Sequence, residues 1–157
     1  MEKIRFAVAG FGHIGKRHAA MITENPECEL VAICDVNPLQ KEALAALGNI
    51  VFYPSVDQLL NSNTGFDVLS IATPNGFHEE HAVKGLEAGK HILVEKPLAL
   101  TKEACKSIIE ASVKHRKHVF CVMQNRYSPA ATWLKEILQE KILGKIFIVE
   151  VSCFWNR

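Results

Sequence analysis

The chain has 157 residues, 48% of them hydrophobic, which is enough for one well-buried globular domain. Its 18 basic and 17 acidic residues leave a formal net charge of +1, which argues against a nucleic-acid-binding or membrane-surface protein. The apolar runs are shorter than the roughly 20 residues that span a bilayer, and the first residues lack the pattern of a signal peptide. A cytoplasmic protein is expected.

Apolar, strand-like runs alternate with helical patterns along the first half of the chain. In order, we predict a strand at 4–9, a helix from about 13 to before 26, a strand at 30–34, a helix at 38–47, a strand at 50–52 and a short helix ending at 60. Residue types at the boundaries support this pattern. Ser55 is a good N-cap, Pro38 suits a first helical turn, and Gly48 suits the end of a helix.

The second half continues the alternation. We predict strands at 67–72, 91–94 and 119–123, and helices at 79–88, from Thr101 to about 117, and at 129–141. Strands that alternate with helices are typical of right-handed crossovers and a parallel sheet. The expected fold is therefore α/β, a Rossmann-type doubly wound parallel sheet with helices on both faces.

The last residues differ from the rest. Residues 145–155 read as a long hydrophobic strand, and the sequence ends soon after it. A strand that stopped there would leave an exposed hydrophobic edge, which natural proteins usually cover. We expect residues 1–144 to form one domain, whose ligand the motifs below indicate, and residues 145–157 to begin a second domain that is missing from this chain.

A glycine-rich turn, Gly10-Phe11-Gly12-His13-Ile14-Gly15, follows the first predicted strand. The first glycine allows a tight turn, the second lets the backbone approach a pyrophosphate, and the third allows close packing of helix on strand. The pyrophosphate would meet free N–H groups at the helix N-terminus, and His13 would contribute only its backbone. The motif predicts a dinucleotide site, with a structural turn or another nucleoside ligand as alternatives.

Asp35 supports the dinucleotide interpretation and indicates which dinucleotide binds. It ends the second predicted strand, 20 positions after Gly15 (35 − 15), the spacing of a carboxylate that binds a ribose hydroxyl. Its negative charge would repel the 2′-phosphate of NADP, and the next residues, Val36-Asn37-Pro38, supply no arginine. NAD is therefore the expected cofactor, and NADP is the less favoured one.

Glu95-Lys96-Pro97 closes the apolar run at 91–94. Ligands of an open parallel sheet sit beyond the carboxyl ends of its strands, so Lys96 is predicted to lie beside the cofactor. Its amine could transfer a proton if its pKa were lowered, or stay charged and stabilise an alkoxide. Both roles belong to a nicotinamide-dependent oxidoreductase.

No metal site is predicted. His78 and His81 stand three positions apart, whereas the zinc-protease pattern separates its histidines by four, and no cysteine is near them. The five cysteines include no Cys-x-x-Cys pair, so we expect all of them to be reduced thiols.

Several separated motifs together resemble the glucose-fructose oxidoreductase/inositol dehydrogenase (Gfo/Idh/MocA) family. They are residues 9–15 with His18, Cys34-Asp35, residues 72–75 with His78, and Glu95-Lys96-Pro97. The resemblance implies that Lys96 is the catalytic lysine, paired with Glu95 at the nicotinamide end. It also implies cofactor-lining roles for Thr73, Pro74, Asn75 and His78, and contacts to cofactor or substrate from Gln124 and Arg126.

The resemblance also implies what the rest of the protein supplies. In the family a second domain, mostly antiparallel sheet with helices, brings a proton-transferring histidine, often with an aspartate, and often builds a homo-oligomer. Residues 124–129 and 154–157 look similar to nucleotide-sugar 3-dehydrogenases, which act on UDP-linked N-acetylamino sugars or their uronates. Simple aldose or inositol dehydrogenases stay open, as do a cofactor-sensing regulatory protein and an S-adenosylmethionine-dependent methyltransferase.

Overall fold

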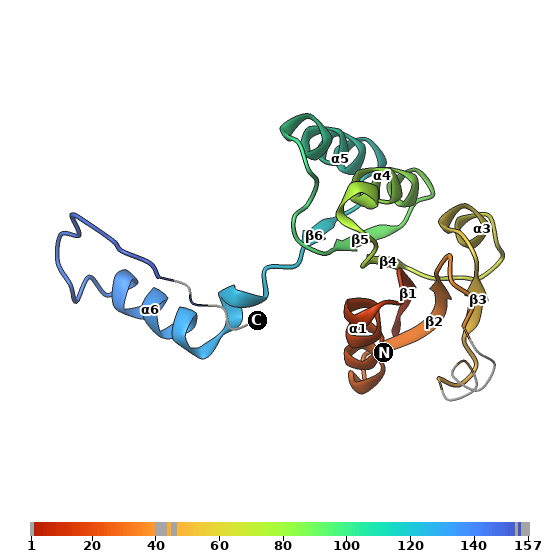
Figure 1. Ribbon diagram of the computed structural model, residues 1–157, viewed down its shortest axis with the longest axis horizontal. Coiled ribbons are helices and arrows are strands. Elements are labelled where there is room, and N and C mark those ends of the chain that lie inside the picture. Colours follow the sequence, from red (N-terminus) through yellow and green to blue (C-terminus); the bar gives the residue numbers. More distant parts are fainter. Residues whose placement is uncertain (1, 40–43, 45–46, 153, 155–157) are drawn as a thin grey trace. The chain divides into compact units, whose positions relative to one another are not determined.

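The computed structural model describes residues 2–39, 44, 47–152 and 154, and the chain divides into two compact units, Met1–Val122 and Met123–Arg157 (Figure 1). The first unit contains a six-stranded sheet in the order β3-β2-β1-β4-β5-β6, and every neighbouring pair is parallel. The strands are β1 (Ile4–Ala9), β2 (Cys28–Cys34), β3 (Val51–Tyr53), β4 (Val68–Ile71), β5 (His91–Val94) and β6 (Val119–Cys121).

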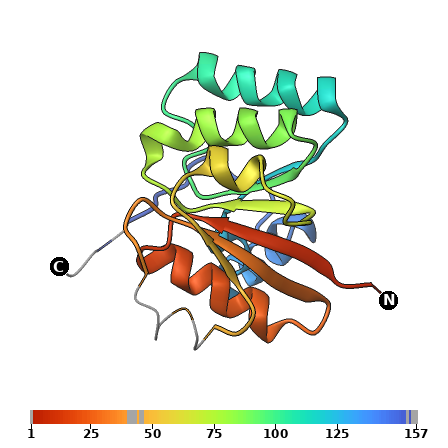
Figure 2. The same ribbon diagram turned by 90° about the vertical axis from the view of Figure 1, so that its right-hand side faces the viewer.

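Helices cover both faces of this sheet, as Figure 2 shows. Helix α1 (His13–Glu24) lies on one face, and α3 (Val56–Leu60), α4 (His78–Glu87) and α5 (Lys102–His115) lie on the other. The strand order reverses direction at β1, whose neighbours are β2 and β4. In a doubly wound sheet, that switch point is where ligands bind beyond the carboxyl ends of the strands. The predicted Rossmann-type fold is confirmed.

The inner strands β1, β2, β4 and β5 contain buried residues because side chains pack on both faces of the sheet. Val8 and Ile33 contact the α1 side, whereas Leu69, Ile71 and Ile92 contact the side of α3 to α5, and all five are fully buried. Each such side chain contributes about 1.5–3 kcal/mol relative to an exposed position. Strands buried on both faces read as continuous apolar runs, which is why sequence pattern located them.

Predicted and observed boundaries agree closely. β1 spans the predicted residues, whereas β2 begins two residues earlier than expected and β6 ends at Cys121 rather than at residue 123. Ser55 caps α3 by accepting the Gln58 N–H at 3.2 Å, and Thr101 caps α5 by accepting the Ala104 N–H at 3.1 Å. The helix predicted at 38–47 falls largely outside the described residues.

The second unit corrects one interpretation. It contains η2 (Gln124–Tyr127) and α6 (Pro129–Gln139), but the described residues from 145 onward form no strand. A strand needs a hydrogen-bonded neighbour, and no described strand pairs with this segment. Helix α6 contains no buried residue, and Trp133, Leu134 and Leu138 are exposed on it.

No helix in the described part of the chain is long and apolar enough to cross a membrane. A hollow lies at the amino ends of the strands, lined by side chains that include Ile4, His91, His118 and Phe120. His91 and His118 stack there with ring centroids 5.3 Å apart. This hollow is at the edge of the sheet opposite the switch point, so it is separate from the predicted cofactor site.

Candidate functional site

The glycine turn connects β1 to α1 at the carboxyl end of β1. Gly10 has a φ of +86°, a conformation that favours glycine, and a Cβ there would lie 2.6 Å from Ala72 O. Gly15 is packed equally tightly, because a Cβ on it would overlap Gly10 O. These two glycines let α1 approach the end of the sheet closely.

Gly12 differs from both, since a Cβ built on it meets nothing within 4 Å. It is the N-cap of α1, makes no side-chain cap bond, and is followed by a first helical turn without an acidic residue. The start of α1, where the helix dipole is positive, therefore has room beside Gly12 for an anionic ligand. His13 and Ile14 are exposed beside it, whereas the Phe11 side chain is buried and anchors the turn.

Asp35 lies directly after β2 and is bonded to the glycine turn. Its Oδ2 accepts the Phe11 N–H at 2.6 Å, and its Oδ1 accepts the Asn37 N–H at 2.8 Å. Each carboxylate oxygen has two acceptor sites, so both oxygens can still accept a hydroxyl. The carboxylate is thus oriented by the backbone before any ligand arrives.

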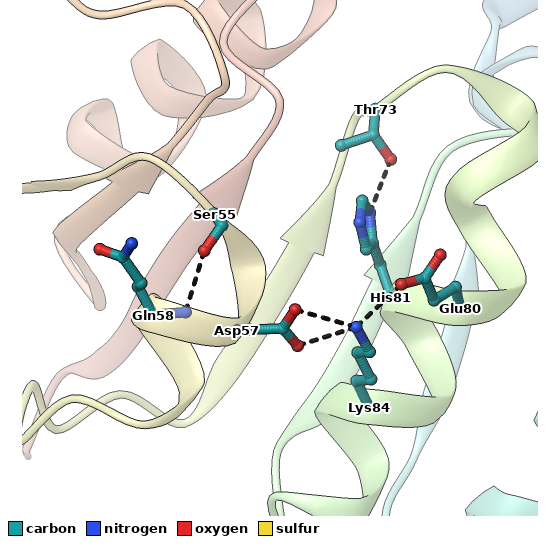
Figure 3. Close-up of polar contacts among 7 residues, drawn as sticks. All are labelled: Ser55, Asp57, Gln58, Thr73, Glu80, His81 and Lys84. Atoms are coloured by element: carbon teal, nitrogen blue, oxygen red, sulfur yellow. Dashed lines mark hydrogen bonds and ion pairs between the residues drawn. The ribbon is translucent and has the colours of Figure 1, made fainter.

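The loop after β4 carries Thr73, Pro74 and Asn75 to the same edge of the sheet. Figure 3 shows the Thr73 hydroxyl against the His81 ring of α4, with Oγ1 and Nδ1 3.1 Å apart. Burial lowers the pKa of His81, which favours its neutral form. In the same view Lys84 bonds Asp57 at 2.8 Å and Glu80 at 2.8 Å, tying α4 to α3 below the loop.

His78 is fully buried and joins two loops of the site. Its Nε2 lies 2.9 Å from Thr73 O, and its Nδ1 lies 2.8 Å from Pro97 O. Both ring nitrogens are therefore used within the protein. This arrangement favours an indirect role in place of the expected direct contact with a cofactor.

Glu95 and Lys96 follow β5, the strand next to β4. The Glu95 carboxylate is 16% exposed; its Oε1 lies 3.0 Å from His18 Nε2, and its Oε2 accepts the Lys96 N–H at 3.2 Å. His18 Nδ1 in turn lies 2.8 Å from Ser70 Oγ. The Lys96 side chain is exposed at the edge of the sheet, where it is free to reach a ligand.

The predicted residues therefore divide into two groups. The first unit brings together, at the carboxyl ends of β1, β2, β4 and β5, the glycine turn, Asp35, Thr73 with its neighbours, and Glu95-Lys96. Gln124 and Arg126 lie on η2 in the second unit, with exposed side chains, and their contact with a ligand stays a prediction. Ser70 and His18 were not among the predicted site residues, although polar groups on the apolar face of a strand or helix are a recognisable signal.

Cys34, the last residue of β2, is a buried thiol next to the site. It precedes Asp35 and is buried, and burial, together with the nearby Asp35 and Asp57 carboxylates, raises the pKa of its thiol to about 12. The thiol therefore behaves as a small hydrophobe in the core, as expected from its apolar run. It takes no part in the chemistry of the site.

Three kinds of group thus meet at one edge of the sheet. An anion-binding helix end, a carboxylate able to accept hydroxyls and an exposed primary amine lie at neighbouring loops. The first two suit the pyrophosphate and ribose of a dinucleotide, and the amine suits a reacting oxygen.

Comparisons with known proteins agree with this arrangement. The family model described as "Oxidoreductase family, NAD-binding Rossmann fold" matches residues 4–123. D-glucoside 3-dehydrogenase of Escherichia coli strain K12 is 33% identical over 147 residues, covering 92% of this chain and 42% of that protein. The WlbA dehydrogenase of Bordetella pertussis, solved with NADH and UDP-GlcNAcA, superposes with a TM-score of 0.86 at 34% identity, covering 93% of this chain and 45% of that one.

A third relative has a different kind of ligand. The scyllo-inositol dehydrogenase of Lactobacillus casei, solved with NAD(H) and scyllo-inositol, gives a TM-score of 0.84 at 26% identity, over 91% of this chain and 43% of that one. The chain therefore spans less than half the length of each of these relatives.

Proposed function

The chain belongs to the Gfo/Idh/MocA oxidoreductase family through its NAD-binding Rossmann domain, and we propose that it is the cofactor-binding part of an NAD-dependent sugar dehydrogenase. The observation that supports this most is the meeting of the glycine turn, Asp35 and Lys96 at the switch point of the sheet. Hydride transfer requires a cofactor held in one orientation beside a polar group for the reacting oxygen. These residues provide both.

The proposed division of the protein follows from its relatives. Because those relatives are more than twice as long as this chain, a further domain would supply the sugar site and the proton-transferring residues. We place the cofactor domain at residues 1–144 and the start of the second domain at 145–157. The exposed apolar side chains Phe147, Ile148 and Val151 would then be covered by that domain, which would also build a homo-oligomer.

The proposed substrate class is a sugar or nucleotide sugar. The WlbA structure contains UDP-GlcNAcA, and residues 124–129 together with 154–157 were the basis for the likeness to nucleotide-sugar 3-dehydrogenases. A sugar oxidised at a ring hydroxyl loses a hydride from carbon and a proton from oxygen. The glycine turn and Asp35 would hold the nicotinamide cofactor, which would supply the hydride-accepting chemistry. Lys96 hydrogen-bonds the reacting oxygen and stabilises the negative charge that develops on it.

Asp35 is proposed to select NAD over NADP. Its two oxygens are held by the Phe11 and Asn37 N–H groups, so the carboxylate cannot easily turn away from a 2′-phosphate. NADH should therefore bind this chain at least about tenfold more tightly than NADPH, a difference of about 1.4 kcal/mol.

Calorimetric titration of the chain with NADH and NADPH tests this assignment. Asp35→Ser should lower the ratio of the two affinities by about tenfold or more, because it removes the repelling charge. Glu110→Gln is the matched control, since Glu110 is an exposed carboxylate on α5 whose loss should leave the ratio unchanged. An unchanged ratio in Asp35→Ser contradicts the role given to Asp35. Binding of neither dinucleotide, repeated with the second domain present, contradicts the proposed function.

A further inference from the structure

Two buried histidines bind the turn that carries Lys96, one on each side of the lysine. His18 of α1 contacts the side chain of Glu95, the residue before it. His78 of α4 contacts the carbonyl oxygen of Pro97, the residue after it. The two helices start at the two loops assigned to the cofactor, so each histidine connects one cofactor loop to the lysine turn.

The contact through His18 fixes both oxygens of Glu95. A carboxylate only accepts hydrogen bonds, so His18 Nε2 carries the proton in its 3.0 Å contact with Glu95 Oε1. The Ser70 hydroxyl, 2.8 Å from Nδ1, holds the other side of the ring. Glu95 Oε2 accepts the backbone N–H of Lys96. A continuous chain of bonds therefore leads from β4 through α1 to the lysine.

The contact through His78 fixes the other side of the turn. Carbonyl oxygens also only accept, so Nδ1 must carry a proton to bond Pro97 O, and Nε2 must carry one to bond Thr73 O. The proton on Nδ1 is the one that joins the ring to the lysine turn. Burying a polar ring in an otherwise apolar layer costs free energy unless its nitrogens are hydrogen-bonded. The two contacts therefore account for a histidine at this position.

We infer that His18 and His78 are positioning residues that hold Lys96 in register with the two cofactor loops. This inference rests on the proposed dehydrogenase function for its kinetic consequence. Neither side chain needs to touch the cofactor or the sugar. Each acts through a neighbour of Lys96, His18 through the Glu95 carboxylate and His78 through the Pro97 carbonyl. Together, His18 and His78 fix the position of the Lys96 amine when the cofactor is bound at both loops.

Paired amide substitutions separate this role from general packing. The amide nitrogen of asparagine takes the place of Nδ1, and that of glutamine takes the place of Nε2. At position 18, therefore, His18→Gln keeps the contact with Glu95 and His18→Asn loses it. At position 78 the order is reversed, because His78→Asn keeps the contact with Pro97 and His78→Gln loses it.

The expected result is opposite amide preferences at the two sites. Measured with the second domain present, kcat of His18→Gln should exceed that of His18→Asn by about tenfold. The kcat of His78→Asn should likewise exceed that of His78→Gln by about tenfold. The dissociation constant for NADH should stay within about threefold across all four variants. Equal kcat values within each pair, or the same amide preferred at both sites, would overturn the inference.

A second measurement uses the unsubstituted chain and does not depend on turnover. Proton-nitrogen correlation spectra of ¹⁵N-labelled histidine rings at neutral pH should show protons on His18 Nε2 and on His78 Nδ1. A nitrogen without a proton at either position means that the hydrogen bond to the lysine turn is absent. The inference then fails, whether or not the substituted variants fold. Failure of the unsubstituted protein to bind NADH overturns the proposed function instead, and the ring spectra still decide whether the two contacts exist.

Discussion

Gly15→Ala is expected to lower the free energy of unfolding by about 3 kcal/mol, while Gly12→Ala lowers it by about 1 kcal/mol, the cost of alanine at an N-cap. An alanine Cβ at Gly15 overlaps the backbone oxygen of Gly10, which cannot move without displacing β1 from α1. A loss of stability at Gly15 is informative, because replacing glycine by alanine inside a helix ordinarily raises the free energy of unfolding by roughly 1 kcal/mol. Urea unfolding of both variants measures the difference as a change in midpoint at constant slope.

The same pair of variants separates packing from cofactor binding. Gly12 has a φ of −69° and open space around its missing Cβ, so alanine fits the fold there. That open space is where the pyrophosphate is proposed to lie, so Gly12→Ala should raise the dissociation constant for NADH by about tenfold or more. A stable Gly12→Ala variant that binds NADH like the parent contradicts a phosphate site at this turn. A Gly15→Ala variant as stable as the parent contradicts the packing.

Lys96→Ala should lower kcat by about a thousandfold in a form of the protein that includes the second domain. The Lys96 side chain is exposed and its backbone N–H is bound by Glu95, so the substitution removes the amine without disturbing the core. The dissociation constant for NADH should change by less than about threefold. Steady-state kinetics on candidate sugars, with NADH binding measured in parallel, gives both quantities.

Lys102→Ala provides the matched control for Lys96→Ala. Lys102 is an exposed lysine at the start of α5, and its loss should leave kcat unchanged. Added small primary amines should restore part of the activity of Lys96→Ala, because an exposed position leaves room for them. Turnover by Lys96→Ala within a few-fold of the parent would contradict the catalytic role given to this lysine, whereas no turnover by the parent on any sugar would favour a cofactor-sensing protein.

Local chemistry explains why most of the first unit could be predicted from sequence. Parallel strands buried on both faces appear as apolar runs, and Ser55 and Thr101 cap helices by contacts only three residues long. The glycine turn is equally local, because the conformation of Gly10 and the fit of Gly15 depend on the strand just before them. Asp35 was placed correctly at the end of β2 by its spacing.

The features that sequence did not predict depend on contacts between residues far apart in the chain. The contact of His78 with Pro97 joins residues 19 positions apart, so sequence pattern did not reveal it, and the cofactor-lining role of His78 stays a prediction. His18 and Glu95 are 77 positions apart, so no local pattern assigns them to each other. The burial of His18 beside Gly15, Ala19 and Ile22 on one face of α1 was the available signal. A hydrophobic run such as 145–155 likewise forms a strand only where a neighbouring strand receives its hydrogen bonds.

The role proposed for Asp35 couples cofactor preference to the shape of the glycine turn, because the same carboxylate serves both. Replacing this carboxylate to admit NADP also removes the hydrogen-bond acceptors of the Phe11 and Asn37 N–H groups. Only replacements that carry a side-chain oxygen, such as serine, threonine or asparagine, can keep part of that bonding. A change of cofactor should therefore proceed through these few residue types, accompanied by a second substitution that supplies positive charge.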